Sequence, residues 1–366
     1  MRSSTAPNLS MKESKIPIEN LYFLLCYAWD RLEERDLVNI AAKDHSQLLD
    51  LLANVLLNGT TYLLKRGLDH DYLPHSLTYA GVKGKLLLPQ TLKRNLLPHN
   101  QTVCEFDEFS PNILHNQILK TTIECLLRCE GIEKGLQSGL RKLIPRFGGV
   151  ASLPLTEKHF RAVRLHRNNA FYGFLLDICE VIHQNLLVNE QTGTYQFRDF
   201  WRDAKQMARL FEAFVRNFYR KEIPTAKVYR ENIRWQVETS QADYRLLPTM
   251  QTDISIELPS RKVLIDTKFY VETFQQYFDA QKIHSQHLYQ LFAYLQNHPD
   301  AQEGILLYPV VNQKISATYQ QHQQKIRVET IDLNQPWRQI RADLLQILLP
   351  LASLDPSEGV QEPFIY

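Results

Sequence analysis

The sequence predicts an α/β protein in which a C-terminal mixed sheet flanked by helices follows an N-terminal α+β domain. Two observations lead to this fold class. The C-terminal half is patterned in the order helix, three strands, helix, strand, strand, helix, which suits a sheet covered by helices. The N-terminal half repeats apolar residues at helical spacing and is interrupted by one stretch with strand and turn signals. A chain of 366 residues is long enough to hold both domains.

The N-terminal half opens with helices. Residues 1–14 are polar and are predicted to form a disordered tail. From Ile16 an apolar stripe predicts a helix, and residues 46–65 predict a second helix that stops before Gly67. Residues 68–103 then combine Pro, Gly and Lys with short apolar runs, which predicts a projecting β-rich element; a long surface loop is the alternative.

Two further helical spans complete this half of the chain. Residues 110–143 and 158–187 carry apolar residues at helical spacing and are separated by a break with Pro and Gly at residues 145–154. The stretch that follows lacks strong periodicity and is the predicted domain boundary. The predicted domains are therefore residues 15–190 and residues 191–366.

The C-terminal half supplies the elements of the predicted sheet. Apolar stripes at a period of 3.6 predict its helices, and alternation or short apolar runs predict its strands. In chain order the elements are a helix at 204–220, a strand at 227–238, a hairpin at 249–270, a helix at 285–296, strands at 304–311 and 326–333, and a closing helix at 337–351.

The predicted hairpin brings two carboxylates together. A turn centred between Pro259 and Ser260 places Asp253 directly opposite Asp266, with Cβ atoms about 4.5–5.5 Å apart. Because alternate side chains of a strand share a face, Asp266 and Lys268 also lie on one side, about 6–7 Å apart. Two acids and one lysine are thus predicted on a single face of the hairpin.

This arrangement suits a divalent cation. Adjacent carboxylates repel one another and weaken a sheet unless a positive charge compensates. Mg²⁺ binds through one or two carboxylates, keeps several waters and meets its substrate through phosphate oxygens. A lysine beside such a site can orient or deprotonate a water, which predicts metal-assisted phosphodiester hydrolysis. The alternative is that these are ordinary charged residues on the exposed face of a hairpin.

Composition and short motifs exclude several other classes. The net charge is +2, and the five cysteines form no C-x-x-C pair, which suits a reducing cytoplasm better than a disulfide framework. An apolar run of about 18 residues is absent, so no membrane association is predicted. Neither G-x-x-x-x-G-K-[ST] nor G-x-G-x-x-G occurs, so the chain is not predicted to bind a nucleotide itself.

The element order and the paired acids resemble the PD-(D/E)xK nuclease superfamily. Asp253 matches the first acid of its signature, and Asp266-Thr267-Lys268 matches its (D/E)-x-K strand motif. The resemblance implies that Asp253, Asp266 and the backbone carbonyl of Thr267 bind Mg²⁺. It also implies that Lys268 positions or activates the attacking water.

Two helices extend this resemblance. One branch of the superfamily carries Q-x-x-x-Y after the strand motif, and Gln290-Leu-Phe-Ala-Tyr294 matches it on one helix face. By resemblance, Gln290 acts with Lys268 in catalysis and Tyr294 supports the same face. Glu212 on the first core helix matches the position of a common superfamily glutamate and is a candidate supporting residue.

Over nearly its whole length the chain resembles a narrower group, the McrC family, which is the nuclease subunit of the McrBC 5-methylcytosine-dependent restriction system. The stretches that carry this resemblance are Ile16-Pro-Ile-Glu-Asn-Leu-Tyr-Phe-Leu-Leu-Cys-Tyr-Ala-Trp29, Gly81-Val-Lys-Gly-Lys85, Phe106-Asp-Glu-Phe-Ser-Pro-Asn112 and His284-Ser-Gln-His-Leu-Tyr-Gln290. That family often has Ala where Thr267 stands, and strand alternation predicts that the Thr267 side chain points away from the acidic face.

The family resemblance implies partners. The N-terminal half is expected to engage and stimulate an McrB-like AAA+ GTPase ring, with residues 68–103 in the region that enters the central pore of the ring. GTP is expected to be bound by that partner and not by this chain. The substrate is expected to be double-stranded DNA that contains modified cytosine, and the C-terminal half is expected to cut it.

Two other functions fit parts of the sequence. The chain could be an adaptor that activates an AAA+ ring and whose nuclease centre is vestigial, although the intact set of two acids and a lysine argues against this. It could also be a stand-alone nuclease of the Q-x-x-x-Y type that acts in repair or in a mobile element.

Overall fold

The computed structural model of the chain describes residues 16–32, 48–165, 169–188, 191–198, 203–269, 283–310, 315–321 and 323–349. These residues belong to two compact units. The sheet unit comprises the described residues up to Leu32 and from residue 203 onward, and the arm unit comprises the described residues from 48 to 198. The predicted tail at 1–14 lies outside the described residues.

The sheet unit is built on a six-stranded mixed sheet in the order β12-β13-β11-β10-β9-β6. β10, β11 and β13 are parallel, whereas β9 and β12 pair antiparallel to their neighbours. The strands are β6 (Lys227–Tyr229), β9 (Ile254–Leu258), β10 (Arg261–Thr267), β11 (Ala301–Val310), β12 (Ser316–Gln321) and β13 (Gln324–Asp332). A two-stranded ladder of β7 (Asn232–Ile233) and β8 (Met250–Gln251) flanks a connection that holds the short helix α10 (Gln241–Tyr244).

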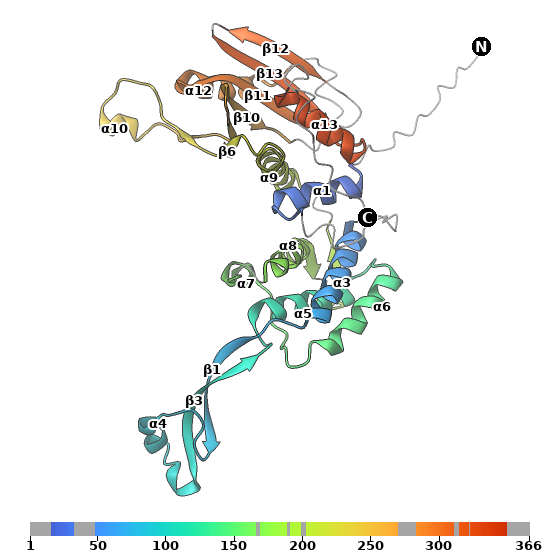
Figure 1. Ribbon diagram of the computed structural model, residues 1–366, viewed down its shortest axis with the longest axis vertical. Coiled ribbons are helices and arrows are strands. Elements are labelled where there is room, and N and C mark those ends of the chain that lie inside the picture. The colour runs from blue at the N-terminus through green and yellow to red at the C-terminus, as the bar shows by residue number, and fades with distance from the viewer. Residues whose placement is uncertain are drawn as a thin grey trace, which may run out of the picture. The chain divides into compact units, whose positions relative to one another are not determined.

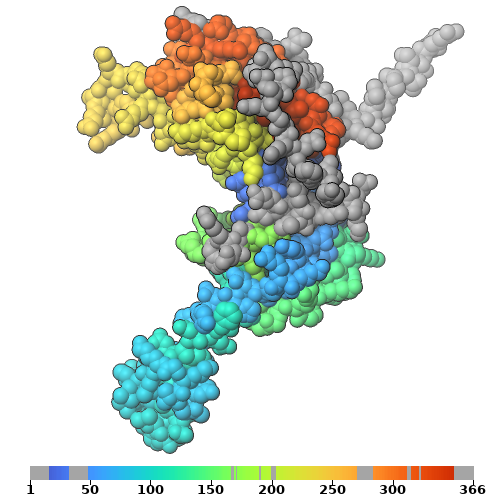
Figure 2. Space-filling model, in the orientation of Figure 1, coloured from blue at the N-terminus to red at the C-terminus, as the bar shows by residue number. Residues whose placement is uncertain are grey.

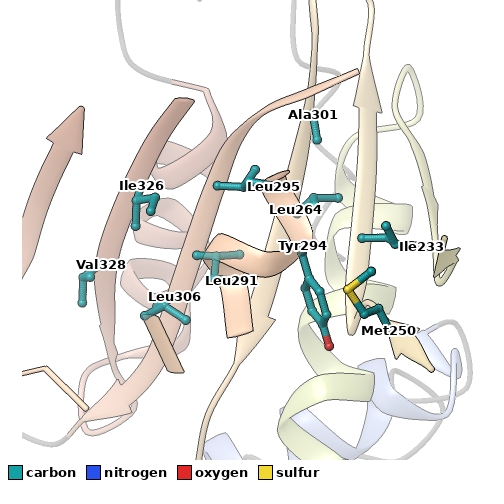
Figure 3. Packing of buried hydrophobic residues seen from close by; sticks show 10 residues of the cluster. All are labelled: Ile233, Met250, Leu264, Leu291, Tyr294, Leu295, Ala301, Leu306, Ile326 and Val328. Carbon is teal, nitrogen blue, oxygen red and sulfur yellow. The ribbon is translucent and has the colours of Figure 1, made fainter. Parts of the chain in front are cut away.

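Helices cover both faces of this sheet, which confirms the predicted mixed sheet flanked by helices (Figure 1). They are α1 (Ile18–Ala28), α9 (Ala204–Glu222), α12 (Ser285–Asn297) and α13 (Trp337–Leu348). On one face, Leu291 and Leu295 of α12 join Leu264, Leu306 and Val328 of the central strands in a buried cluster (Figure 3). The apolar stripe of α12 therefore fixes which of its sides faces the sheet.

The close approach of α12 depends on Gly304 in β11. A Cβ atom at this position would lie 2.9 Å from side-chain atoms of both Leu291 and Leu295. Any larger residue would have to push the helix away from the strand. The glycine thus sets the height of α12 above the sheet.

α9 and α13 cover the opposite face. Because alternate residues of a strand point to opposite faces, Arg327 of β13 lies on the other side of the sheet from Val328. Its Nη1 donates to the carbonyl oxygen of Ile347 in α13 at 2.7 Å. The Tyr219 hydroxyl of α9 in turn donates to the carbonyl oxygen of Leu344 at 2.9 Å. These contacts make α9, α13 and the sheet one packed body.

α1 belongs to the sheet unit, whereas the next described helix, α3, belongs to the arm unit. Asn20 Nδ2 donates to the carbonyl oxygen of Leu333 at 2.8 Å, and the Tyr27 ring lies 5.3 Å from the Phe218 ring of α9. The structure therefore differs from the predicted single domain at residues 15–190. A buried amide and contacts between aromatic rings hold this first helix against α9 and the end of β13.

The arm unit has a helical body. Its helices are α3 (Leu48–Arg66), α5 (Leu114–Leu127), α6 (Lys134–Leu143), the 3-10 turn η2 (Ile144–Arg146), α7 (Glu157–Ala162) and α8 (Ala170–Asn185). A hairpin of β4 (Leu186–Val188) and β5 (Tyr195–Phe197) follows α8 and crosses the predicted boundary between residues 190 and 191. Because that hairpin belongs to the arm unit, the division falls between Asp199 and Phe200.

An arm projects from this body (Figures 1 and 2). It consists of β1 (Asp71–Ala80), β2 (Lys85–Leu86), α4 (Leu88–Lys93), the 3-10 turn η1 (Leu97–His99) and β3 (Gln101–Ser110). β1 and β3 pair antiparallel along their whole length, from Asp71 opposite Ser110 to Ala80 opposite Gln101. The stretch predicted as β-rich is thus a paired-strand element, and the surface-loop alternative does not hold.

Buried polar side chains fix the root of the arm. Asn116 of α5 is fully buried, and its Nδ2 donates to the carbonyl oxygens of Asp69 and Pro111, both at 2.8 Å. These two residues stand just before β1 and just after β3. The Tyr172 hydroxyl of α8 donates to Asn116 Oδ1 at 2.7 Å, and the Asp69 carboxylate accepts from His115 and Asn169. One amide therefore clamps both strands to the body.

Among the described residues, no helix is long and apolar enough to cross a membrane.

Candidate active site

The β9–β10 hairpin has the predicted register and brings the two acids to the end of its ladder. The ladder pairs Arg261 with Leu258 and continues to Ile265 opposite Ile254, with residues 259 and 260 in the turn. Asp253 and Asp266 are the next positions beyond the last paired residues. The predicted register is therefore confirmed up to the site, and the two acids lie where the ladder opens.

Asp266 is buried beneath α12 and is 1% exposed. Its Oδ2 lies 2.7 Å from Lys268 Nζ in an ion pair. No well-directed hydrogen bond reaches either carboxylate oxygen from the described residues. Burial raises the pKa of Asp266 to about 7, Lys268 opposes the rise, and the charges of Asp253 and Glu212 add to it. A buried acid with unsatisfied oxygens is therefore the centre of the site.

Asp253 is held by the strand that carries Asp266. Its Oδ2 accepts hydrogen bonds from the backbone N–H of Thr267 at 2.9 Å and from the Thr267 hydroxyl at 3.0 Å. The prediction that the Thr267 side chain points away from the acids is wrong. Asp253 precedes β9, so its side chain is not bound to strand alternation and reaches across to Thr267.

Lys268 joins a hydrogen-bonded chain on α12. Its Nζ donates to Gln290 Oε1 at 3.1 Å, and Gln290 Nε2 donates to the Tyr294 hydroxyl at 2.8 Å. The hydroxyl then donates to the carbonyl oxygen of Gln251 at 2.9 Å, two residues before Asp253. Figure 3 shows the Tyr294 ring beside Met250, on the side of α12 that faces this part of the sheet. The structure thus links both predicted α12 residues to the acids.

Glu212 of α9 also lies near the site, since its charge acts on Asp266. Its Oε1 forms ion pairs with Arg216 Nη1 at 2.7 Å and with Arg230 Nε at 3.5 Å. Arg230 in addition donates to the side-chain oxygen of Gln251 at 3.0 Å. Two guanidinium groups therefore neutralise Glu212, which suits the supporting role predicted for it.

The donor set fits Mg²⁺. No group of three or more His, Cys, Asp or Glu side chains in the described ranges forms a metal cage. Mg²⁺ does not need one, because it binds through one or two carboxylates and completes its octahedron with water and phosphate oxygens. The unsatisfied, buried oxygens of Asp266 beside Asp253 provide such a pair. That the Thr267 carbonyl is a further ligand remains a prediction.

Three nearby residues were not singled out from the sequence. His287 of α12 pairs with the Tyr308 hydroxyl of β11 at 2.8 Å, and Arg230 borders the site through Glu212. His287 precedes Gln290 by three positions, so helical spacing alone places it on the same face. Nothing in the sequence pattern indicates Arg230 or Tyr308, since both depend on neighbouring strands.

Fold and site together define a two-unit α/β protein with paired acids and a lysine at one end of a mixed sheet. The sequence model described as McrBC 5-methylcytosine restriction system component matches residues 7–309. The chain belongs to this family of restriction system components.

Two relatives support this assignment. A protein of Escherichia coli K12, described as the type IV methyl-directed restriction enzyme EcoKMcrBC, is 33% identical over 342 residues, which cover 92% of this chain and 98% of the relative. The fold matches a solved half-complex from the tetradecameric assembly of Thermococcus gammatolerans McrB AAA+ hexamers with bound McrC. That match has a TM-score of 0.55 at 17% identity and covers 91% of this chain and 76% of the other.

Proposed function

We propose that this chain is the Mg²⁺-dependent DNA endonuclease subunit of a GTP-dependent restriction complex directed to modified cytosine. The observation that carries the proposal is the buried Asp266, ion-paired with Lys268 and near Asp253, in a chain of the McrBC family. The strand order around these residues also supports a PD-(D/E)xK nuclease core. The reaction is hydrolysis of a phosphodiester in DNA, in the cytoplasm.

Each residue has a role in this reaction. Asp253 and Asp266 hold the cation, which when bound supplies Lewis-acid polarisation of the scissile phosphate. Lys268 orients the attacking water and offsets negative charge that develops on the phosphate. Gln290 fixes the Lys268 ammonium through a 3.1 Å hydrogen bond, and Tyr294 fixes Gln290. The water oxygen bonds to phosphorus, one ester P–O bond breaks, and the products are a phosphomonoester and an alcohol.

The arm unit provides the proposed contact with the partner. The E. coli relative is named as a methyl-directed restriction enzyme, and the archaeal structure contains McrB AAA+ hexamers with bound McrC. By analogy, the partner of this chain is an McrB-like AAA+ GTPase ring. The ring binds GTP and reads the modified base, and the chain stimulates its GTPase activity. The arm exposes large apolar side chains, among them Tyr72 at 65%, Leu92 at 56% and Phe109 at 60%. Exposed apolar surface of this extent is typical of a docking element.

The proposal is tested by cleavage of methylated DNA with the purified chain, its partner, GTP and Mg²⁺. We expect Asp266→Ala and Lys268→Ala each to lower the cleavage rate at least about 100-fold, because each removes a group that acts in the transition state. Binding to the partner ring, measured by size-exclusion chromatography, is expected to remain.

Other outcomes separate the alternatives. Full cleavage by Asp266→Ala would reject the site. Stimulation of the partner GTPase without any cleavage by the unmodified chain would favour the adaptor. Degradation of DNA by the chain without a partner would favour a stand-alone nuclease.

A further inference from the structure

α12 carries three polar side chains in one row, and each reaches a different strand of the site. His287, Gln290 and Tyr294 follow the spacing i, i+3, i+7, which confines them to an arc of about 60° on the helix. Gln290 accepts from Lys268 at the end of β10, and Tyr294 donates to the backbone just before Asp253. His287, the third residue of this row, is not among the residues to which the proposed reaction gives a role.

That third member, His287, is buried and points at β11. Its Nδ1 lies 2.8 Å from the Tyr308 hydroxyl. His287 is 6% exposed, and its ring centroid is 5.9 Å from the Tyr308 ring. The pair therefore ties the first turns of α12 to the strand beside β10.

Tyr308 stands at the level of Lys268. Strand β11 runs parallel to β10 with Asp266 opposite Leu306 and Thr267 opposite Leu307. The backbone N–H of Lys268 donates to the carbonyl oxygen of Leu307 at 3.0 Å, so the next residue of β11, Tyr308, adjoins the lysine. His287, Tyr308 and Lys268 thus meet at the ends of two neighbouring strands.

The electrostatics agree with this placement. Burial, together with the charges of Lys268 and His284, lowers the pKa of His287 to about 4. The imidazole is therefore neutral at neutral pH and does not compete with Lys268 for the negative groups of the site.

We propose that His287, held by Tyr308, is a positioning residue for the nuclease centre, because it fixes the first turns of α12 and with them the Gln290 amide that holds Lys268. This inference rests on the proposed nuclease function. The hydrophobic docking of α12 does not depend on the pair, since Leu291 and Leu295 pack against Gly304 without it. Loss of the His287–Tyr308 hydrogen bond is expected to leave α12 packed on the sheet and to make the position of the Lys268 ammonium less fixed.

The experiment measures the steady-state kinetics of cleavage of methylated DNA by the full chain with its AAA+ partner, GTP and Mg²⁺. We expect Tyr308→Phe and His287→Leu to lower kcat about tenfold or more while KM for DNA changes less than about twofold, as for groups that orient a reacting residue. His287→Asn keeps a group that can form a hydrogen bond with the Tyr308 hydroxyl near the Nδ1 position, and it is expected to cut faster than His287→Leu. The double variant is expected to be no slower than the slower single variant, because the two side chains act as one unit.

Tyr319→Phe is the matched control. Tyr319 lies on the edge strand β12 and is 49% exposed, so removal of its hydroxyl is expected to leave the rate unchanged. Thermal melting of each variant separates positioning from unfolding, and Tyr308→Phe removes only one oxygen atom. A role in folding alone predicts that His287→Asn, His287→Leu and Tyr308→Phe lose rate only in proportion to the folded fraction, and this result would overturn the inference.

Asp266→Ala, assayed beside these variants, distinguishes a failure of the positioning role from a failure of the nuclease assignment. If Asp266→Ala is inactive while His287→Leu and Tyr308→Phe cut at the rate of the unmodified chain, the positioning role is wrong and the nuclease assignment stands. If Asp266→Ala cuts normally, the nuclease site itself is wrong.

Discussion

The proposed chemistry depends on Asp266. A carboxylate that is 1% exposed and lacks well-directed hydrogen bonds is costly to ionise in a folded chain. Its ion pair with Lys268 offsets part of that cost, and a divalent cation would offset the rest. The same burial that destabilises the free carboxylate therefore prepares it to bind metal.

The raised pKa has a consequence for stability. The folded, metal-free protein binds a proton at Asp266 up to about pH 7, whereas the unfolded chain releases it near the ordinary value of 3.8. The free energy of unfolding is therefore expected to fall as pH rises between these two values, because the folded state holds the extra proton.

Urea unfolding in EDTA across this pH range checks this expectation against Asp266→Asn, which cannot ionise. The unmodified chain should lose more stability with rising pH than the variant, and added Mg²⁺ should reduce the difference. Equal slopes for the two proteins would show that Asp266 titrates normally.

At the scale of single residues, the sequence predicts where a residue lies in the hairpin better than it predicts which side chains that residue contacts. The alternation around Pro259 and Ser260 predicts the register of the ladder up to Ile265 opposite Ile254, because register in a tight hairpin follows from the turn. The predicted direct pair of Asp253 with Asp266 falls one position beyond the end of the ladder. Strand alternation does not predict the orientation of the Thr267 side chain toward Asp253. The Thr267 hydroxyl donates to Asp253 because Asp253 lies outside the ladder. Arg230 approaches the site from the connection between β6 and β7, and Tyr308 lies on β11; no local sequence pattern indicates such contacts.

At the scale of elements, α12 and the arm are held in place in two different ways: α12 by apolar packing and the arm by buried hydrogen bonds at its root. α12 is set by an apolar stripe over Gly304, with polar ties along one edge. The arm is a long two-stranded ribbon, and a ribbon of this kind is marginally stable by itself. Its direction therefore depends on the buried amide of Asn116 at its root.

Asn116→Ala is expected to lower the free energy of unfolding by about 3 kcal/mol, because it leaves the carbonyls of Asp69 and Pro111 and the Tyr172 hydroxyl without their partner. Urea unfolding measures this change. Asn58→Ala in α3 is the matched control, since within the described ranges Asn58 Nδ2 donates to the Asn54 side chain at 3.1 Å on the same helix, and less than about 1 kcal/mol is expected there. A similar loss in both variants would contradict the role of the clamp.

The elements themselves were largely predictable. Helices such as α9 and α13 carry strong apolar stripes, and the predicted bounds agree with the observed ones to within a few residues. β12 was not predicted, because its sequence from Ser316 to Gln321 is mostly polar and it is a strand only through its pairing with β13. The strand predicted at 227–238 is instead two short strands, because the ladder with β9 ends at Tyr229.

At the scale of the whole molecule, the chain is organised as two units that do not follow sequence order. α1 begins the described chain and yet packs with α9 in the sheet unit. No local sequence pattern predicts the packing of α1 on α9, because an apolar stripe shows that one face of a helix is buried but not which element covers it. The family resemblance, by contrast, extends over the chain and is confirmed by the match at residues 7–309.

The sheet unit contains every residue assigned to the site. Asp253, Asp266, Lys268, Gln290, Tyr294 and Glu212 all lie between α9 and α12 in the chain. Because all of these residues belong to this chain, metal binding is expected in the chain without its partner.

Binding of Mn²⁺ to the isolated full-length chain, followed by electron paramagnetic resonance at neutral pH, tests the central claim most directly. We expect a bound ion in the unmodified chain, loss of binding in both Asp253→Ala and Asp266→Ala, and retained binding in Lys268→Met, because the two acids hold the cation and the lysine does not. Unchanged Mn²⁺ binding in both aspartate variants would contradict the assignment of this hairpin as a metal-dependent catalytic centre.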